Sequence, residues 1–308
     1  MEYRKEIDTI IDQISFKGKF NINLDNYDHI LIGGMGGSGI AGFLFSEIYS
    51  KKPVIVLNTY TCPDFVSNKT LVIAISYSGN TEETISCATE AKKKGATVLS
   101  ITSGGKLSEI SDQAVIIPSG YQPRSSLGFL LMPIINTIAP ELRNHIDEIK
   151  GNITDIRNNE NHIISISRKI FESGKVPYFI SWSPTSSVAY RCKTQFNENA
   201  KMLANAGYLS EINHNELVPM GMNHDMDPFI YIAFKNSYSE RNERRLEITK
   251  KLSSRDITII ELKGKSIFSQ IMYGIYFGDI LSYHVALLRK VEPRDVSIIE
   301  KLKLELSS

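Results

Sequence analysis

Cysteine is scarce in this sequence, which has 308 residues and only three cysteines, Cys62, Cys87 and Cys192. Their odd number and wide spacing exclude a disulfide framework and a paired-cysteine zinc site. Such sparse use of cysteine suits a reducing compartment, and the charged, amphipathic amino terminus lacks the apolar core of a signal peptide. We therefore expect the chain to be cytoplasmic.

A long uninterrupted apolar run is also missing. The best candidate, Leu127 to Ile138, falls short of the roughly 18–20 residues that a membrane-spanning helix needs, and Pro133 interrupts it. The net charge is only +1, from 35 basic and 34 acidic residues, which argues against binding nucleic acid by neutralising phosphates. We therefore expect neither a membrane nor a nucleic acid among the partners.

Short apolar runs alternate with helical patterns along the first half of the sequence. Five of these runs predict strands, at His29–Ile32, Pro53–Leu57, Leu71–Ser76, Ala96–Thr102 and Ala114–Pro118. Strands that alternate with helices indicate a parallel sheet covered on both faces. An amphipathic helix over residues 2–14 precedes this pattern, and the sequence leaves open which domain it packs on.

The alternation restarts after a polar, asparagine-rich stretch at residues 150–160. Predicted strands follow at Val176–Trp182, Phe229–Phe234 and Ile257–Leu262, and predicted helices at about 162–173, 187–204, 265–289 and 294–306. The sequence therefore predicts an α/β protein with two doubly wound parallel-sheet domains in tandem, at residues 1–152 and 153–308.

A glycine-rich loop, residues 33–39, follows the first predicted strand and opens a helix. Glycines let backbone N–H groups approach an anion, and a helix amino terminus adds a partial positive charge. The loop also fits the spacing of a dinucleotide-binding fingerprint. However, the second strand ends at Asn58 rather than at the acidic residue that would hold a ribose, so a nicotinamide-dependent enzyme is a weak hypothesis.

A second polar turn follows the third predicted strand and opens the next helix. Because the carboxyl ends of parallel strands meet at one crevice, we expect Ser38, Ser76, Ser78 and Thr81 to converge there. Four hydroxyl groups with helix amino-terminal amides can bind a phosphate monoester. The alternative is that these residues only cap helices. That alternative fits Thr81 but does not explain the serines on either side of Tyr77.

The segments GGMGGSGIAG and ISYSGNTEET together resemble the sugar isomerase (SIS) domain. The segments QPRSSLG at 122–128, RCKTQFNENAK at 191–201 and SEINHNE at 210–216 are similar to the archaeal and bacterial phosphoglucose/phosphomannose isomerases, which consist of two SIS domains. This resemblance covers essentially the whole chain. It implies that the first domain binds the sugar phosphate through Gly37 and the four hydroxyl residues. The second domain lacks such a glycine loop and would supply catalytic residues.

The resemblance further implies an aldose–ketose isomerase that interconverts glucose 6-phosphate, and mannose 6-phosphate as well, with fructose 6-phosphate, as in glycolysis or gluconeogenesis. Glu198 matches the general base that moves a proton between C2 and C1 through a cis-enediol. His214 matches the ring-opening histidine, donated across the interface of a homodimer, and Lys303 matches a lysine that assists it. Arg124, in a loop after the fifth strand, is placed to stabilise the enediolate oxygen.

Plainer explanations exist for these residues. Glu198 and Arg124 could be solvated surface groups, and His214 a structural histidine. A non-catalytic phosphosugar-binding SIS regulator is the alternative function, although such regulators carry a DNA-binding module that this sequence lacks. His224 and Asp227 are the nearest approach to a metal-ligand pair, and two ligands do not make a site, so we expect neither a metal nor a cofactor.

Overall fold

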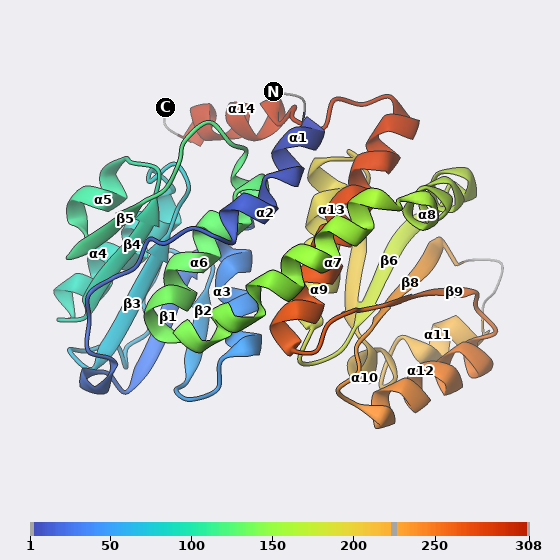
Figure 1. The fold of residues 1–308 in the computed structure, drawn as a ribbon, viewed down its shortest axis with the longest axis horizontal. Helices are drawn as coiled ribbons and strands as arrows, with labels where there is room; N and C mark the ends of the chain where they lie inside the picture. The colour runs from blue at the N-terminus through green and yellow to red at the C-terminus, as the bar shows by residue number, and fades with distance from the viewer. Residues whose placement is uncertain (1–2, 223–226, 307–308) are drawn as a thin grey trace. The chain divides into compact units, whose positions relative to one another are not determined.

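The computed structural model describes residues 3–222 and 227–306, which form two compact units (Figure 1). The amino-terminal unit contains Lys5–Ile153 and Gly264–Ile271. The carboxyl-terminal unit contains the chain up to Arg4, Thr154–Lys263 and the chain from Met272 onward. Two short segments, the one that ends at Arg4 and residues 264–271, are thus each separated in sequence from the rest of the unit to which they belong.

Hydrogen bonds explain why residues 264–271 belong to the amino-terminal unit. The Glu148 carboxylate accepts a hydrogen bond from the backbone N–H of Lys265 at 2.7 Å and from the hydroxyl of Ser269 at 2.7 Å. A carboxylate with two such donors fixes the segment although it lies more than a hundred residues away in sequence. The hydrophobic periodicity of the sequence does not indicate that residues 264–271 belong to the amino-terminal unit.

A five-stranded parallel sheet forms the core of the amino-terminal unit, in the order β2-β1-β3-β4-β5. Its strands are β1 (His29–Gly34), β2 (Val54–Leu57), β3 (Thr70–Ile75), β4 (Thr97–Thr102) and β5 (Gln113–Ile116). The strand order reverses between β1 and β3, where Gly34 lies opposite Ile75. In open α/β sheets a ligand crevice lies at such a reversal, outside the carboxyl ends of the strands.

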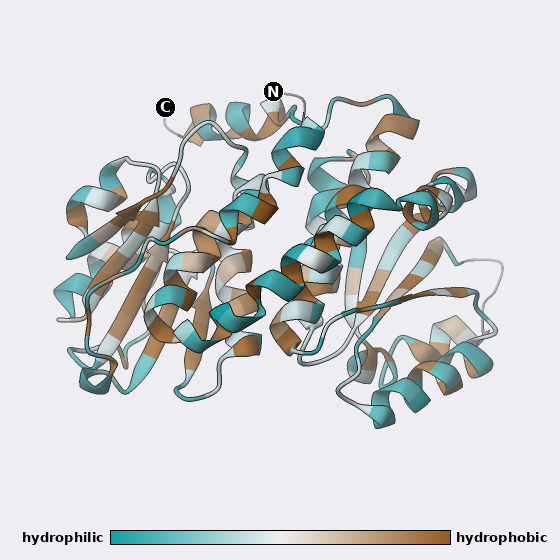
Figure 2. Cartoon of the chain, viewed as in Figure 1, coloured by the Kyte–Doolittle hydropathy of each residue, from teal (hydrophilic) through white to brown (hydrophobic). Residues whose placement is uncertain are grey.

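Right-handed crossovers place helices on both faces of this sheet (Figure 1). The helices α3 (Gly36–Ile48) and α6 (Leu127–Ile138) pack together on one face, and α4 (Glu82–Lys93) and α5 (Lys106–Ile110) lie on the other. The α4 face buries Leu31, Val72 and Val98 with Cys87. Apolar residues are concentrated along the strands of both sheets, as Figure 2 shows.

The sheet of the carboxyl-terminal unit has four parallel strands in the order β7-β6-β8-β9. They are β6 (Val176–Ser181), β7 (Asn205–Tyr208), β8 (Phe229–Lys235) and β9 (Ile257–Glu261). The strand β7 was not predicted, because its four residues, Asn-Ala-Gly-Tyr, have low strand propensity. Pairing with β6 forms it, with Asn205 opposite Tyr178.

Helices also cover both faces of the second sheet. On one face, α10 (Leu209–Ile212), α11 (Leu217–Met222) and α12 (Glu240–Ser253) bury an apolar cluster that includes Trp182 and Leu246. On the other, α9 (Ser186–Glu198) lies against α13 (Ile267–Arg289), where glycine allows close packing. A Cβ added at Gly274 would lie 2.6 Å from Val188, and one at Gly278 would lie 3.0 Å from Cys192.

The polar stretch expected to separate the domains is helical. It lies mostly within α7 (Ile146–Asn158), which joins the two units and is followed by α8 (Asn161–Ser173). Ile149, Ile153 and Ile156 recur at helical spacing and are all buried, so one face of this polar sequence packs. The high asparagine content suggested a linker, although the apolar spacing is that of an amphipathic helix.

Among the described residues, α13 is the one helix whose length and composition would allow it to cross a membrane. Its most apolar 18-residue window has a mean hydropathy of 1.3 and is 83% buried within the protein, as expected of a core helix. The best candidate by uninterrupted apolar residues was Leu127 to Ile138, and α13 escaped that criterion because it contains isolated polar residues such as Asp279.

Asp279 forms a buried ion pair with Arg191 on α9, with Nη2 and Oδ2 2.8 Å apart. We expect Asp279→Ala to lower the free energy of unfolding by about 3–5 kcal/mol, because it removes the carboxylate that pairs with a buried guanidinium. Urea denaturation followed by circular dichroism measures this. Asp256→Ala is the control, since it breaks an exposed pair with Lys169 and should cost far less. Equal losses would contradict this account.

Candidate active site

The two polar loops predicted to bind phosphate lie side by side at the carboxyl ends of β1 and β3. Ser38 lies in the first turn of α3, and its hydroxyl accepts a hydrogen bond from the backbone N–H of Tyr77 at 3.3 Å. The first turn of a helix leaves amide N–H groups without intrahelical acceptors, so donors gather at this edge. The predicted convergence of Ser38 with the second loop is confirmed by this contact.

The hydroxyl groups of Ser76 and Thr81 contact each other at 2.8 Å. Ser76 is buried, and its Oγ also accepts a hydrogen bond from the N–H of Gly79 at 3.1 Å. Thr81 occupies the N-cap position of α4 but makes no side-chain cap hydrogen bond, so the capping explanation is wrong for it. Ser78 is exposed, and its hydroxyl accepts from the N–H of Asn80 at 3.2 Å.

The second loop depends on a glycine and a buried tyrosine. Gly79 has a φ of +70°, and an added Cβ would lie 1.7 Å from the carbonyl oxygen of Gly104, so only glycine fits. The Tyr77 hydroxyl donates to the carbonyl of Pro118 at 3.0 Å and accepts from the N–H of Tyr121 at 2.9 Å. Burial raises the pKa of Tyr77, which keeps the hydroxyl protonated. No role for Tyr77 was predicted from the sequence.

Arg124 lies in a short 3-10 helix, η2 (Pro123–Ser125), and is only 3% exposed, so it is not a solvated loop residue. Its Nη1 donates to Oε1 of Gln122 at 3.0 Å. Gly37 packs directly against the backbone of this turn, because an added Cβ would lie 2.9 Å from the carbonyl oxygen of Pro123 and 3.0 Å from Arg124. The glycine loop and the arginine turn are therefore in backbone contact.

Glu198 is half-buried and is the last residue of α9, not an interior residue of a helix over 187–204 as expected. The residue after it, Asn199, is fully buried. Its Nδ2 donates to the hydroxyl of Ser282 at 2.9 Å, and its Oδ1 accepts from the hydroxyl of Tyr3 at 2.8 Å. These bonds fix the backbone at the end of α9, directly after Glu198.

Lys201 closes the carboxyl end of α9. It has a φ of +51°, and its Nζ donates to the carbonyl oxygens of Glu198 and Pro293. A cation next to the last carbonyls of a helix offsets the helix dipole. A lysine in left-handed geometry thus ends the helix at Glu198, which the helical periodicity did not indicate.

His214 is exposed in the turn after α10. The residues beside it are held: Asn213 donates to Thr249 Oγ1 at 2.7 Å, and Glu216 accepts from the hydroxyl of Tyr178. Asn215 Nδ2 donates to a carboxylate oxygen of Glu211 at 2.9 Å. The turn is thus rigid while the imidazole itself is presented to the surface.

Lys303 lies on α14 (Ser297–Leu306), and none of the described residues of that helix is buried. Ile299 and Leu302 lie three residues apart on this helix and are 39% and 58% exposed. The apolar spacing of this helix is real, but within the described chain nothing buries it.

In the carboxyl-terminal unit, the loop after β6 is filled by its own side chains. The Trp182 Nε1–H donates to Oδ1 of Asn236 at 3.0 Å, and Asn236 Nδ2 donates to Thr185 Oγ1 at 2.9 Å. All three residues are buried. This loop corresponds in topology to the glycine loop of the first unit. Buried side chains occupy the place that glycines have in the first unit.

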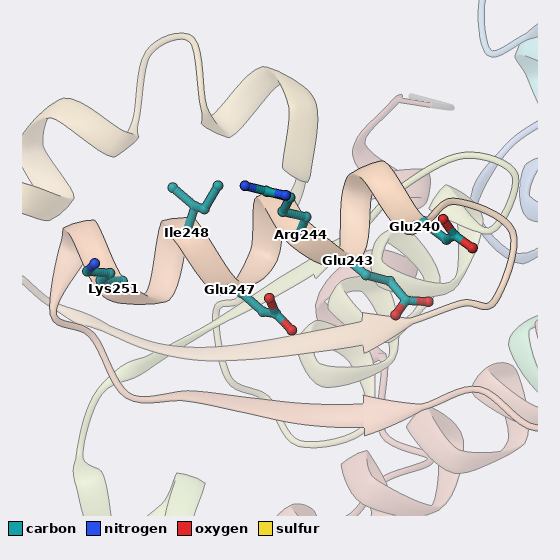
Figure 3. A pocket seen from close by; sticks show the side chains of 6 residues that line it. All are labelled: Glu240, Glu243, Arg244, Glu247, Ile248 and Lys251. Carbon is teal, nitrogen blue, oxygen red and sulfur yellow. The ribbon is translucent and has the colours of Figure 1, made fainter.

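A hollow elsewhere on the surface does not compete with this site. All six lining side chains stand on α12 (Figure 3): Glu240, Glu243, Arg244, Glu247, Ile248 and Lys251. Five of them carry charges of both signs on a single helix, which is typical of a solvated face.

No group of three or more potential ligands suited to a metal ion occurs within residues 3–222 and 227–306. Asp227 is instead engaged by Arg255, with Nε and Oδ2 3.0 Å apart. His224 lies outside the described residues.

The predicted residues are thus distributed over both units. The structure gathers Gly37, Ser38, Ser76, Thr81 and Arg124 at one edge of the amino-terminal sheet. Glu198, His214 and Lys303 belong to the carboxyl-terminal unit, on the end of α9, the turn after α10, and α14. Their catalytic roles stay predictions.

Comparison with known proteins agrees with this architecture. Residues 23–140 match the family model of the SIS domain, and residues 159–306 match that of the bacterial phospho-glucose isomerase C-terminal SIS domain. The C-terminal domain of glucosamine-fructose-6-phosphate aminotransferase from Francisella tularensis has the same fold, with a TM-score of 0.75 at 19% identity over 94% of this chain and 96% of that one. The chain is therefore a protein of two SIS-type domains, as predicted.

Relatives at higher identity specify the family. A bifunctional phosphoglucose/phosphomannose isomerase of Thermoplasma acidophilum is 47% identical, over 100% of this chain and 98% of its own. One from Aquifex aeolicus is 36% identical, over 92% of each chain. The chain belongs to the bifunctional phosphoglucose/phosphomannose isomerase family.

The contact at Gly37 can be tested directly. We expect Gly37→Ala to lower the free energy of unfolding by about 1–3 kcal/mol, because the new methyl group meets backbone atoms that cannot rotate away. Gly33→Ala is the control, since a Cβ there meets nothing within 4 Å. Thermal unfolding of both variants measures the difference. Equal stability of the two variants would contradict this account, because it would show that the backbone at Arg124 moves aside at no cost.

Proposed function

We propose that the protein interconverts glucose 6-phosphate and mannose 6-phosphate with fructose 6-phosphate. The observation that supports this most directly is the contact of the Ser38 and Ser76–Thr81 loops at the strand-order reversal. Hydroxyl groups and helix amino-terminal amides there suit a phosphate monoester. The relatives share the name bifunctional phosphoglucose/phosphomannose isomerase, which supports both substrates.

In this proposal the phosphate is bound by Ser38, Ser76, Ser78, Thr81 and the backbone at Gly37. The Ser76 and Thr81 hydroxyls already contact each other, so an anion needs only a rotation of their O–H bonds to be bound by both. The exposed Ser78 can turn toward the ligand at little cost. The phosphate therefore fixes one end of the sugar without taking part in the chemistry.

The reaction itself is a proton transfer between adjacent carbons. His214, assisted by Lys303, protonates the ring oxygen and opens the sugar, since imidazole can serve as a general acid. Glu198 removes the proton from C2 and returns it at C1. The guanidinium of Arg124 stabilises the negative oxygen of the cis-enediolate between these steps.

We further infer that the protein acts as a homodimer in which His214 serves the site of the partner subunit. Support comes from the exposure of His214 within a turn that is otherwise hydrogen-bonded. The exposed apolar residues of α14 offer a surface that an assembly could cover. A cytoplasmic location is inferred from three free, buried cysteines.

Purified protein should form both glucose 6-phosphate and mannose 6-phosphate from fructose 6-phosphate in the presence of EDTA. We expect Glu198→Gln to lower kcat by roughly 10²–10⁴-fold, the usual contribution of a general base, while affinity for fructose 6-phosphate is retained. Coupled enzymatic assays of each product measure the rates, and calorimetry measures the affinity. Glu172→Gln, an exposed carboxylate on α8, is the control.

The outcomes separate the possible functions. Formation of only one aldose would restrict the enzyme to one epimer at C2. Tight binding of fructose 6-phosphate without either product would favour the phosphosugar-binding regulator instead.

Sharing of His214 between subunits can be tested by complementation. Glu198→Gln and His214→Gln chains are each expected to be nearly inactive alone. When they are co-expressed, half of the sites in each mixed dimer regain both residues, so about a quarter of wild-type activity should return if the chains pair at random. Differently tagged chains allow the mixed dimer to be isolated and assayed. No recovery in the mixed dimer would place both residues in the same subunit's site.

A further inference from the structure

The helices at the amino terminus carry two buried polar side chains that the proposed reaction does not use. Glu6 lies on α1 (Tyr3–Asp8) and is 1% exposed, and Gln13 ends α2 (Ile10–Gln13) and is 0% exposed. Buried polar groups are costly unless they are hydrogen-bonded. Both side chains make such bonds to the segment that carries Arg124.

Gln13 contacts the chain on the carboxyl side of Arg124. Its Nε2 donates to the carbonyl of Ser125 at 2.7 Å, and its Oε1 accepts from the N–H of Gly128 at 2.9 Å. A Cβ at Gly128 would lie 2.5 Å from Cβ of Gln13, so glycine is needed for this approach. One amide thus fixes both the end of η2 and the start of α6.

Glu6 contacts the turn on both sides of Arg124. Its carboxylate accepts hydrogen bonds from the backbone N–H of Gln122 and from the hydroxyl of Ser125. Gln122 in turn accepts the hydrogen bond from Nη1 of Arg124. The carboxylate, Gln122 and the guanidinium therefore form a continuous chain of contacts.

These contacts hold the turn without using the Arg124 side chain. The Gly37 contact and the Glu6 and Gln13 bonds all act on the backbone of the turn or on Ser125. A group that stabilises a developing negative charge is effective only if it is held in place before the reaction. Fixing the backbone at 122–128 limits where the guanidinium can lie.

We propose that Glu6 and Gln13 are positioning residues for Arg124, so that the amino-terminal helices are part of the support of the reaction centre. This inference rests on the proposed isomerase function. It assigns a role to the helix that the sequence left without a packing partner.

The test compares two amide side chains that tie the same amino-terminal segment to α6. Gln13→Met keeps the size of the side chain and removes its hydrogen bonds near Arg124. Asn136→Leu is the matched control, because Asn136 Nδ2 donates to the carbonyls of Phe16 at 3.0 Å and Gly18 at 2.8 Å, near the other end of α6. Both variants should unfold at a lower temperature than the wild type.

Only Gln13→Met should affect turnover. We expect its kcat to fall about 10- to 100-fold, as small misplacements of a catalytic group do, while KM for fructose 6-phosphate changes little. In an Arg124→Ala background the same substitution should have no further effect on kcat, because it acts through Arg124. Asn136→Leu should retain the kcat of the wild type.

Glu6 gives an independent readout if Gln13→Met does not fold. Glu6→Met removes both acceptors, whereas Glu6→Gln keeps a carbonyl oxygen that can accept the same bonds. We expect Glu6→Gln to recover most of the kcat that Glu6→Met loses.

A wild-type kcat in Gln13→Met, or equal losses of kcat in Gln13→Met and Asn136→Leu, would overturn the positioning role. If the wild type isomerises and Glu198→Gln does not, such a result contradicts this inference alone. If the wild type forms no aldose phosphate, the proposed function itself fails.

Discussion

The close approach between Gly37 and the backbone of Pro123 and Arg124 is the constraint on which the sheet edge that carries Ser38, Ser76 and Thr81 depends. No side chain fits between α3 and this turn, so the position of one sets the position of the other. The same first turn of α3 carries Ser38, which accepts a hydrogen bond from the Tyr77 backbone. The Gly37 backbone contact and the Ser38 hydrogen bond thus couple the glycine loop, the serine loop and the arginine turn.

The carboxyl-terminal unit positions its residues by another principle. There, helix α9 is held against α13 by the buried pair of Arg191 and Asp279, and Gln195 donates to the same carboxylate at 2.9 Å. Glu198 follows on the next turn, where Asn199 and Lys201 end the helix. A side chain at the end of a fixed helix keeps its backbone still while its carboxylate can rotate, which suits a group that carries a proton between two carbons.

The sequence predicted what local pattern determines. Strands such as Leu71–Ser76 were evident from apolar runs, and the polar loops from their glycines and serines, because these signals need no knowledge of distant partners. The strand β7 and the roles of Tyr77 and Gln13 were not predictable in this way, because each depends on a group far away in sequence, as the bond from Gln13 to Ser125 shows. The helix over residues 150–158 was missed for another reason, since its apolar spacing is local but lies within an asparagine-rich stretch.

The two sheets have related topologies but opposite use of the loop after their first strand. In the first unit this loop is built of glycine, and its backbone is available to an anion. In the second, Trp182, Thr185 and Asn236 occupy the corresponding place and satisfy one another's hydrogen bonds. The Trp182 N–H is already used by Asn236, and the buried indole ring adds apolar burial. The buried contacts of the loop after β6 therefore stabilise its own unit, which accords with the proposal that the first unit binds the phosphate and the second supplies Glu198 and His214.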